Sequence, residues 1–136
     1  MASIVVVGPD AALLEGVSRT LVGAGHKVMA AKDIPEALET LHGARPLVAL
    51  VDIEELSRSG SVFRVSLAEG GALLAYHGDE LDAVELPFRL QRMSLAELRL
   101  PLERQRLLAL IGYVESRART AGRESVEGDG LEASSP

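Results

Sequence analysis

The chain has 136 residues, of which 47% are hydrophobic and 25% are charged, enough for one globular domain with its own core. It has no cysteine, which excludes disulfides, zinc–thiolate sites and cysteine nucleophiles. No leader opens it, and no apolar run approaches the roughly 18 residues of a membrane span, so we expect a cytoplasmic protein.

The net charge of −6 is unevenly distributed. Residues 1–88 hold 13 acids and 6 bases, residues 89–123 hold 3 acids and 8 arginines, and the last 13 residues hold four acids and no base. Arginine matches the planar geometry of carboxylates, so the arginine-rich block predicts a surface for an acidic protein partner. With Tyr113 as its only aromatic residue, this block does not predict direct nucleic-acid binding.

The first half of the chain predicts alternating strands and helices. Ser3–Gly8 is a short apolar run that suits a strand covered on both faces. A helix should follow Asp10 and end near Gly25, with an apolar face made of Leu13, Leu14, Val17 and Leu21.

A second strand is predicted at Lys27–Ala31. Asp33 and Glu36 form the pattern of a capping box, which predicts that a second helix starts there. Leu47–Val51 should be a third, fully buried strand. This order of elements predicts parallel strands joined by crossover helices.

The second half gives a weaker pattern. We expect a helix over Ser61–Glu69, a strand over Gly71–His77 and a short helix between Asp79 and Pro87. The fifth strand could be Ala83–Phe88 or Leu95–Leu100, and we favour the second because it leaves room for a crossover helix.

A final helix should run from Leu102 to about Ala121, and residues 122–136 lack the apolar content to pack. The sequence therefore predicts an α/β domain over residues 1–121, with a five-stranded parallel sheet between two layers of helices. Residues 122–136 should be a disordered tail or linker.

Several stretches resemble the receiver domains of bacterial response regulators, with their flavodoxin-like fold. Gly60 lies eight residues after Asp52, where the family has a loop glycine. The other stretches are GHKVMAAKDIPEALETL, then RPLVALVD, and LPLERQRLLALIGYV. The resemblance covers about residues 3–121 and is greatest to receivers of enhancer-binding, NtrC-type transcription regulators.

The resemblance places Asp52 at the position that accepts a phosphoryl group in two-component phosphorelays. The positions of the acidic pair that helps to bind magnesium in the family are occupied here by Gly8 and Pro9. Asp10 lies one residue after that pair. The hydroxyl position falls on Tyr76 and the lysine position on Leu100. The resemblance therefore implies a degenerate receiver, or pseudo-receiver, in which Asp52 is inactive and no cofactor is needed.

Simpler interpretations exist for the acidic residues. Asp10 is more typical of a helix N-cap than of a metal ligand. Asp52 could be an inert acid at the end of its strand, and Glu54 and Glu55 could be solvated loop charges. A weak magnesium site would have to be built from Asp10 and Asp52.

We expect a non-enzymatic signalling module that dimerises or binds a protein partner through its last strand and last helix. The candidate interface residues are Arg99, Arg106, Leu110, Tyr113 and Arg117. The alternative is an ordinary receiver, phosphorylated on Asp52 in the presence of magnesium. A third hypothesis is a small-ligand sensor that uses the vacated acidic pocket.

Overall fold

In the computed structural model, residues 2–58, 65–78 and 92–134 are described, with the backbone alone for 121–134. Five parallel strands form one sheet in the order β2-β1-β3-β4-β5. The strands are β1 (Ser3–Val7), β2 (Lys27–Ala31), β3 (Val48–Asp52), β4 (Ala72–His77) and β5 (Ser94–Arg99). Strand order reverses between β1 and β3, the place where open α/β sheets bind ligands beyond their carboxyl ends.

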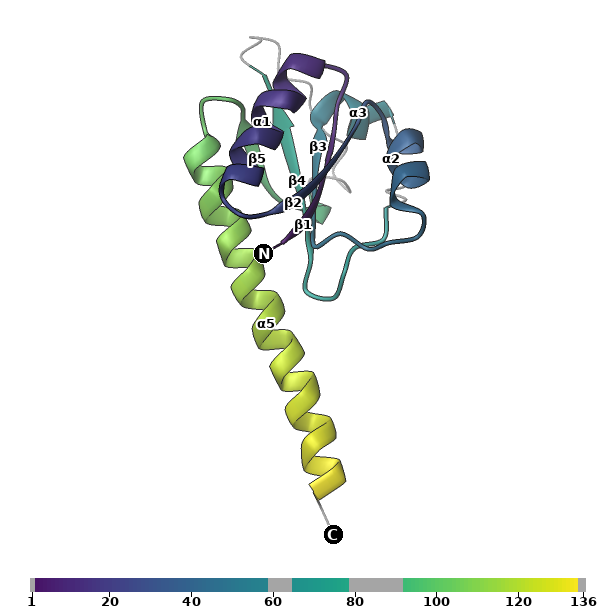
Figure 1. Cartoon of the computed structure of the whole chain (residues 1–136), viewed down its shortest axis with the longest axis vertical. Helices are drawn as coiled ribbons and strands as arrows, with labels where there is room; N and C mark the ends of the chain where they lie inside the picture. Colours follow the sequence, from purple (N-terminus) through teal and green to yellow (C-terminus); the bar gives the residue numbers. More distant parts are fainter. Residues whose placement is uncertain (1, 59–64, 79–91, 135–136) are drawn as a thin grey trace.

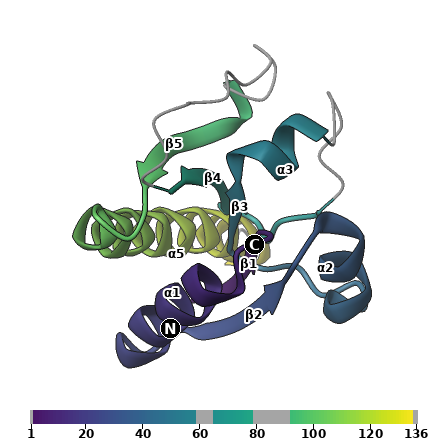
Figure 2. The ribbon, with the colours of Figure 1, turned by 90° about the horizontal axis from the view of Figure 1, so that it is seen from above.

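Two layers of helices enclose this sheet (Figures 1 and 2). Helices α1 (Ala11–Gly23) and α5 (Arg104–Ser134) cover one face, and α2 (Ile34–Leu41) and α3 (Ile53–Arg58) cover the other. Alternate residues of β1 serve the two layers, since Ile4 and Val6 pack toward α1 and α5 while Val7 packs toward α2 and α3. The predicted three-layer α/β fold is confirmed.

Local sequence signals fix the start and end of α1 and the start of α2 as predicted. Asp10 caps α1, where its carboxylate accepts a hydrogen bond from the Leu13 amide at 3.1 Å. Asp33 caps α2 through the Glu36 amide at 2.8 Å. Gly25 follows α1 with a φ of 92°, a conformation that glycine adopts without strain.

The helix that follows β3 was placed wrongly by the sequence analysis. The described part of the predicted Ser61–Glu69 helix, from Val65 on, is not helical. Instead α3 begins directly after Asp52, whose Oδ1 accepts hydrogen bonds from the amides of Glu54 at 2.8 Å and Glu55 at 3.4 Å. Asp52 thus acts as a cap for this short helix.

Glu55 corrects the prediction of two solvated loop charges. Glu54 is exposed, but the Glu55 side chain is buried, and the residue is only 8% exposed. Its Oε1 accepts a hydrogen bond from the Ile34 amide at 3.1 Å, and its Oε2 lies 3.7 Å from Arg58. A carboxylate of α3 thereby satisfies a free amide at the start of α2.

The end of the chain agrees with the preferred interpretation of the fifth strand. Strand β5 is Ser94–Arg99, within one residue of the predicted Leu95–Leu100. The helix predicted between Asp79 and Pro87, and the alternative strand at Ala83–Phe88, lie outside the described residues. Helix α5 runs to Ser134 and extends beyond the sheet (Figure 1), past the predicted end near Ala121. The division into residues 1–121 and a tail stays a prediction.

Among the described residues, none of the helices combines the length and the apolar character needed to cross a lipid bilayer.

Replacing Glu55 with alanine should lower the free energy of unfolding by about 1–3 kcal/mol, because the Ile34 amide loses its charged acceptor inside the protein. Glu55→Gln keeps an acceptor oxygen and should lose less. Urea denaturation followed by circular dichroism measures the difference. The matched control is Glu54→Ala, one residue earlier on the exposed side of α3, which should change stability by no more than about 0.5 kcal/mol. Equal losses in the two alanine variants would contradict a role for the buried carboxylate.

Candidate functional site

Asp52 is the last residue of β3 and lies half-buried at the carboxyl edge of the sheet, beside Tyr76 of β4 in the strand register. Burial raises the pKa of Asp52, although its hydrogen bonds from the amides of Glu54 and Glu55 act in the opposite direction. One oxygen of the Asp52 carboxylate caps α3. Because the residue is half-buried, its carboxyl group is harder to ionise than that of an exposed aspartate.

Tyr76 closes this edge of the sheet. Its ring is 1% exposed, and its hydroxyl donates a hydrogen bond to the carbonyl of Val7 at 3.1 Å. Because β3 lies between β1 and β4, the phenol reaches across the end of β3 to the last residue of β1. Burial raises the pKa of Tyr76 well above its ordinary value, and the charges of Asp52 and Asp10 raise it further. The phenol thus stays protonated and neutral at physiological pH.

Gly8 directly follows β1 and lies against the Tyr76 hydroxyl. A Cβ atom at position 8 would collide with the Tyr76 hydroxyl and would lie 3.2 Å from the Cβ of Asp52. Any side chain at this position requires Tyr76 to move. The carboxylate that the resemblance would place here does not fit while the Tyr76 hydroxyl holds this position.

The acidic residues near this edge make a poor magnesium site. Magnesium needs near-octahedral oxygen ligands, which proteins supply as one or two carboxylates together with waters or phosphates. One oxygen of Asp10 already caps α1, and one oxygen of Asp52 caps α3. In the described part of the chain, no three or more His, Cys, Asp and Glu side chains gather as a metal site would require. The described residues thus offer no preorganised set of magnesium ligands at this edge.

Leu100, at the lysine position of the resemblance, follows β5 and is completely buried. It packs in the core cluster shared with α1 and α5, which includes Leu98 and Leu107, and its amide donates to the carbonyl of His77 at 2.9 Å. The side chain at this position therefore contributes apolar packing and no positive charge.

The predicted interface residues lie on β5 and α5. Arg99, Arg106, Tyr113 and Arg117 are exposed, whereas Leu110 is half-buried against the core cluster. Four of these positions are thus exposed and Leu110 belongs partly to the core, while an interface at these residues stays a prediction.

The sequence analysis did not predict two contacts at this edge of the sheet. The contact between Gly8 and Tyr76 joins residues far apart in the chain, and the hydrogen bond of Glu55 to α2 does the same. The one available signal for the first was a bulky tyrosine and a glycine at two positions of the same family site.

No protein-family model and no curated protein matches this chain. Solved structures do. A CheY-like response regulator receiver domain protein from Methanospirillum hungatei superposes with a TM-score of 0.65 at 21% identity, over 88% of this chain and 98% of that chain. Full-length FixJ from B. japonicum gives a TM-score of 0.65 at 21% identity, over 97% of this chain and 66% of that one.

NtrX from Brucella abortus, in complex with ATP, gives a TM-score of 0.65 at 15% identity, and the match covers 91% of this chain and 29% of NtrX. The chain therefore spans less than a third of the length of that regulator. These likenesses establish that the chain has the fold of response-regulator receiver domains.

Introducing a methyl group at Gly8 should destabilise the protein by about 1–3 kcal/mol, because it overpacks the site against the Tyr76 hydroxyl. In a Tyr76→Ala background, which itself costs about 3–5 kcal/mol, Gly8→Ala should cost less than about 1 kcal/mol. Urea denaturation of the four proteins gives this coupling.

The matched control for Gly8→Ala is Gly16→Ala in α1, where no atom lies within 4 Å of an added Cβ. It should raise stability by about 0.5–1 kcal/mol, as expected for a glycine in a helix interior. If Gly8→Ala costs the same with and without Tyr76, the two residues do not compete for one space.

Proposed function

We propose that this chain is a receiver-type signalling module that acts by binding proteins and does not transfer a phosphoryl group. The observation that carries the proposal is the Tyr76 hydroxyl, held by the Val7 carbonyl against Gly8. It fills the space in which a side chain at position 8 would reach a metal ion beside Asp52.

Phosphoryl transfer depends on positioning and on the neutralisation of charge by a metal ion and cationic groups. At this edge, position 8 has no side chain, Tyr76 offers a neutral phenol already bound to a carbonyl, and Leu100 is apolar. Loss of one preorganised contact to a developing charge typically costs about 10²–10³ in rate. These losses together argue against a phosphorylated Asp52, so the module needs neither magnesium nor enzymatic activity.

The proposed binding surface is the β5–α5 face, defined here by Arg99, Arg106, Tyr113 and Arg117. Tyr113 is 54% exposed, and the Arg117 guanidinium lies 5.7 Å from the centroid of its ring. Aromatic and arginine side chains are enriched among the residues that dominate binding energy at protein interfaces.

Two arginines of the β5–α5 face are held in place by the protein itself. Arg106 donates to the Glu97 carbonyl at 3.2 Å and to the Glu103 carboxylate at 3.0 Å. Arg117 donates to the carbonyls of Gly70 and Gly71, both at 3.2 Å. Side chains that are already ordered lose less conformational entropy on binding, which favours association.

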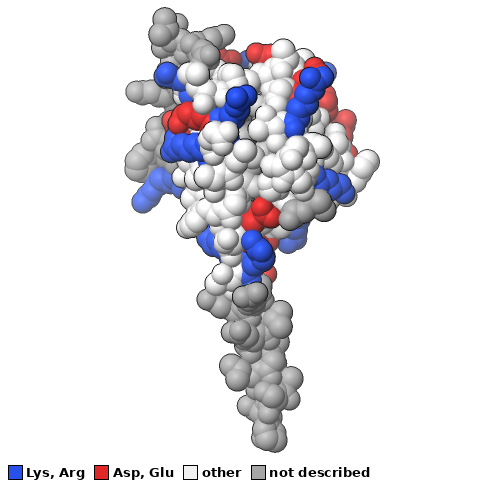
Figure 3. All heavy atoms as spheres, turned by 60° about the vertical axis from the view of Figure 1, so that its left-hand side comes forward, with Lys and Arg blue, Asp and Glu red and all other residues white. Residues whose placement is uncertain are grey.

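The charge of this face indicates the chemistry of the partner. On the side of the molecule that carries α1, α5 and β5, several Lys and Arg side chains border a band of uncharged surface (Figure 3). An acidic protein surface would complement it, and residues 124–136 of a second copy, with four acids and no base, carry this charge.

Incubation of the protein with magnesium and acetyl phosphate should give no mass increase of one phosphoryl group, because Asp52 lacks the required cations. Intact-mass spectrometry measures this, with a receiver that retains the acidic pair and the lysine as the positive control. An adduct that disappears in Asp52→Asn would establish the alternative, an ordinary phosphorylated receiver.

Tyr113→Ala should weaken association through the β5–α5 face by about 2 kcal/mol, or roughly thirtyfold, as expected for a central aromatic residue. Sedimentation velocity of the full chain over a concentration series measures self-association, and the same variant serves in any partner assay. The matched control is Val22→Ala on α1, which removes an equally exposed apolar side chain, 58% accessible, from another element. Unchanged association in Tyr113→Ala, in a protein that does associate, would exclude this surface.

A further inference from the structure

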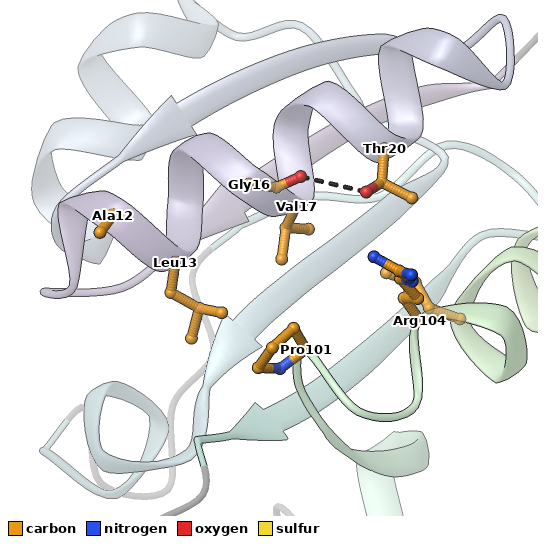
Figure 4. A pocket seen from close by; sticks show the side chains of 8 residues that line it. Ala12, Leu13, Gly16, Val17, Thr20, Pro101 and Arg104 are labelled. Carbon is orange, nitrogen blue, oxygen red and sulfur yellow. Dashed lines mark hydrogen bonds between the residues drawn. The ribbon is translucent and has the colours of Figure 1, made fainter.

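A cleft of about 230 Å³ lies between α1 and the start of α5. Its deepest residues, Val17 and Leu107, belong to the buried core, and Leu13 and Pro101 contribute further apolar surface (Figure 4). None of the residues that line the cleft is part of the Asp52–Tyr76 edge. The cleft is thus a second, separate feature of the molecule.

Gly16 keeps the cleft open on the α1 side. No atom lies within 4 Å of a Cβ built on this residue, and Gly16 is exposed in the middle of the helix. Glycine destabilises a helix interior, so helix formation does not explain its presence here. A larger side chain at this position would project into the cleft.

Arg104 supplies the one cation of the cleft. Its guanidinium points from α5 toward Thr20 across the opening (Figure 4), and it forms no ion pair with any residue in the described ranges. Two nearby arginines differ, because Arg19 pairs with Glu15 at 2.6 Å and Arg106 pairs with Glu103 at 3.0 Å. Arg104 is therefore available for an anion.

We propose that this cleft binds a small carboxylate with a compact apolar body of one ring. The ring would pack on Val17, Leu107 and Leu13, and the carboxylate would accept paired hydrogen bonds from Arg104. An apolar cavity of about 150 Å³ is known to hold benzene, so about 230 Å³ accommodates a ring with a short acidic arm. The proposal concerns a small-molecule site and does not depend on whether Asp52 is phosphorylated.

The test uses 3-phenylpropionate as the probe and the full-length ¹⁵N-labelled chain. In a titration to the order of 5 mM, the amides of Gly16, Thr20 and Arg104 should shift saturably, with a Kd of about 0.1–1 mM for a ligand of this size. The amides of Asp52 and Glu54 should not shift. Replacing the probe with 3-cyclohexylpropionate distinguishes an aromatic from an aliphatic ring, and saturable binding of either supports the proposal.

Variants separate the two parts of the site. Arg104→Gln should weaken binding about tenfold or more, and 3-phenylpropanol, which lacks the carboxylate, should bind the unmodified protein equally weakly. Gly16→Leu should abolish binding by filling the cleft. The matched control, Arg19→Gln, removes an arginine of α1 that is already paired with Glu15, and it should leave the Kd unchanged.

Three results would overturn the proposal. The first is the absence of saturable shifts at these amides with both ring compounds. The second is binding that persists in Gly16→Leu. The third is a shift of the same amides with protein concentration alone, which would show that a second copy of the chain occupies the cleft.

Discussion

The hydrogen bond from the Tyr76 hydroxyl to the Val7 carbonyl is the contact that determines how side chains pack at the carboxyl edge of the sheet. It crosses the end of β3 and joins β4 to β1 at the edge where an open α/β sheet would bind a ligand. The phenol lies directly against Gly8, so a side chain at position 8 would require Tyr76 to move. One buried tyrosine thereby satisfies a backbone carbonyl and occupies the space beside Gly8.

The acidic residues at this edge accept hydrogen bonds from backbone amides at helix starts. Asp10 caps α1, Asp52 caps α3, and Glu55 satisfies an amide at the start of α2. Leu100 completes the core between the sheet and α5. The receiver fold is thus retained through core packing and helix capping, and the proposed function rests on the chemistry of this edge and not on the fold.

Helix α5 carries the residues on which both proposals depend. Arg106 anchors α5 to β5, and Arg117, which anchors it to the turn before β4, lies 5.7 Å from the centroid of the Tyr113 ring. Gly70 permits this close packing, because its φ is 79° and a Cβ there would lie 2.8 Å from the Cα of Ala118. The same helix begins beside the cleft that contains Arg104. Helix α5 therefore links the proposed protein-binding face to the proposed small-molecule site.

The sequence by itself determined the elements whose signals are local. Short apolar runs located β1 to β4, and apolar periodicity located the face of α1. Asp10 and Asp33 located two helix starts, because caps and amphipathic faces involve residues within a few positions of one another. Helix α3 was missed, since its six residues are too few for a periodic pattern. Only the tertiary structure decided that Tyr76 meets Gly8 and that Glu55 is buried against Ile34, because these contacts join residues that lie far apart in the chain and become neighbours when the parallel strands align.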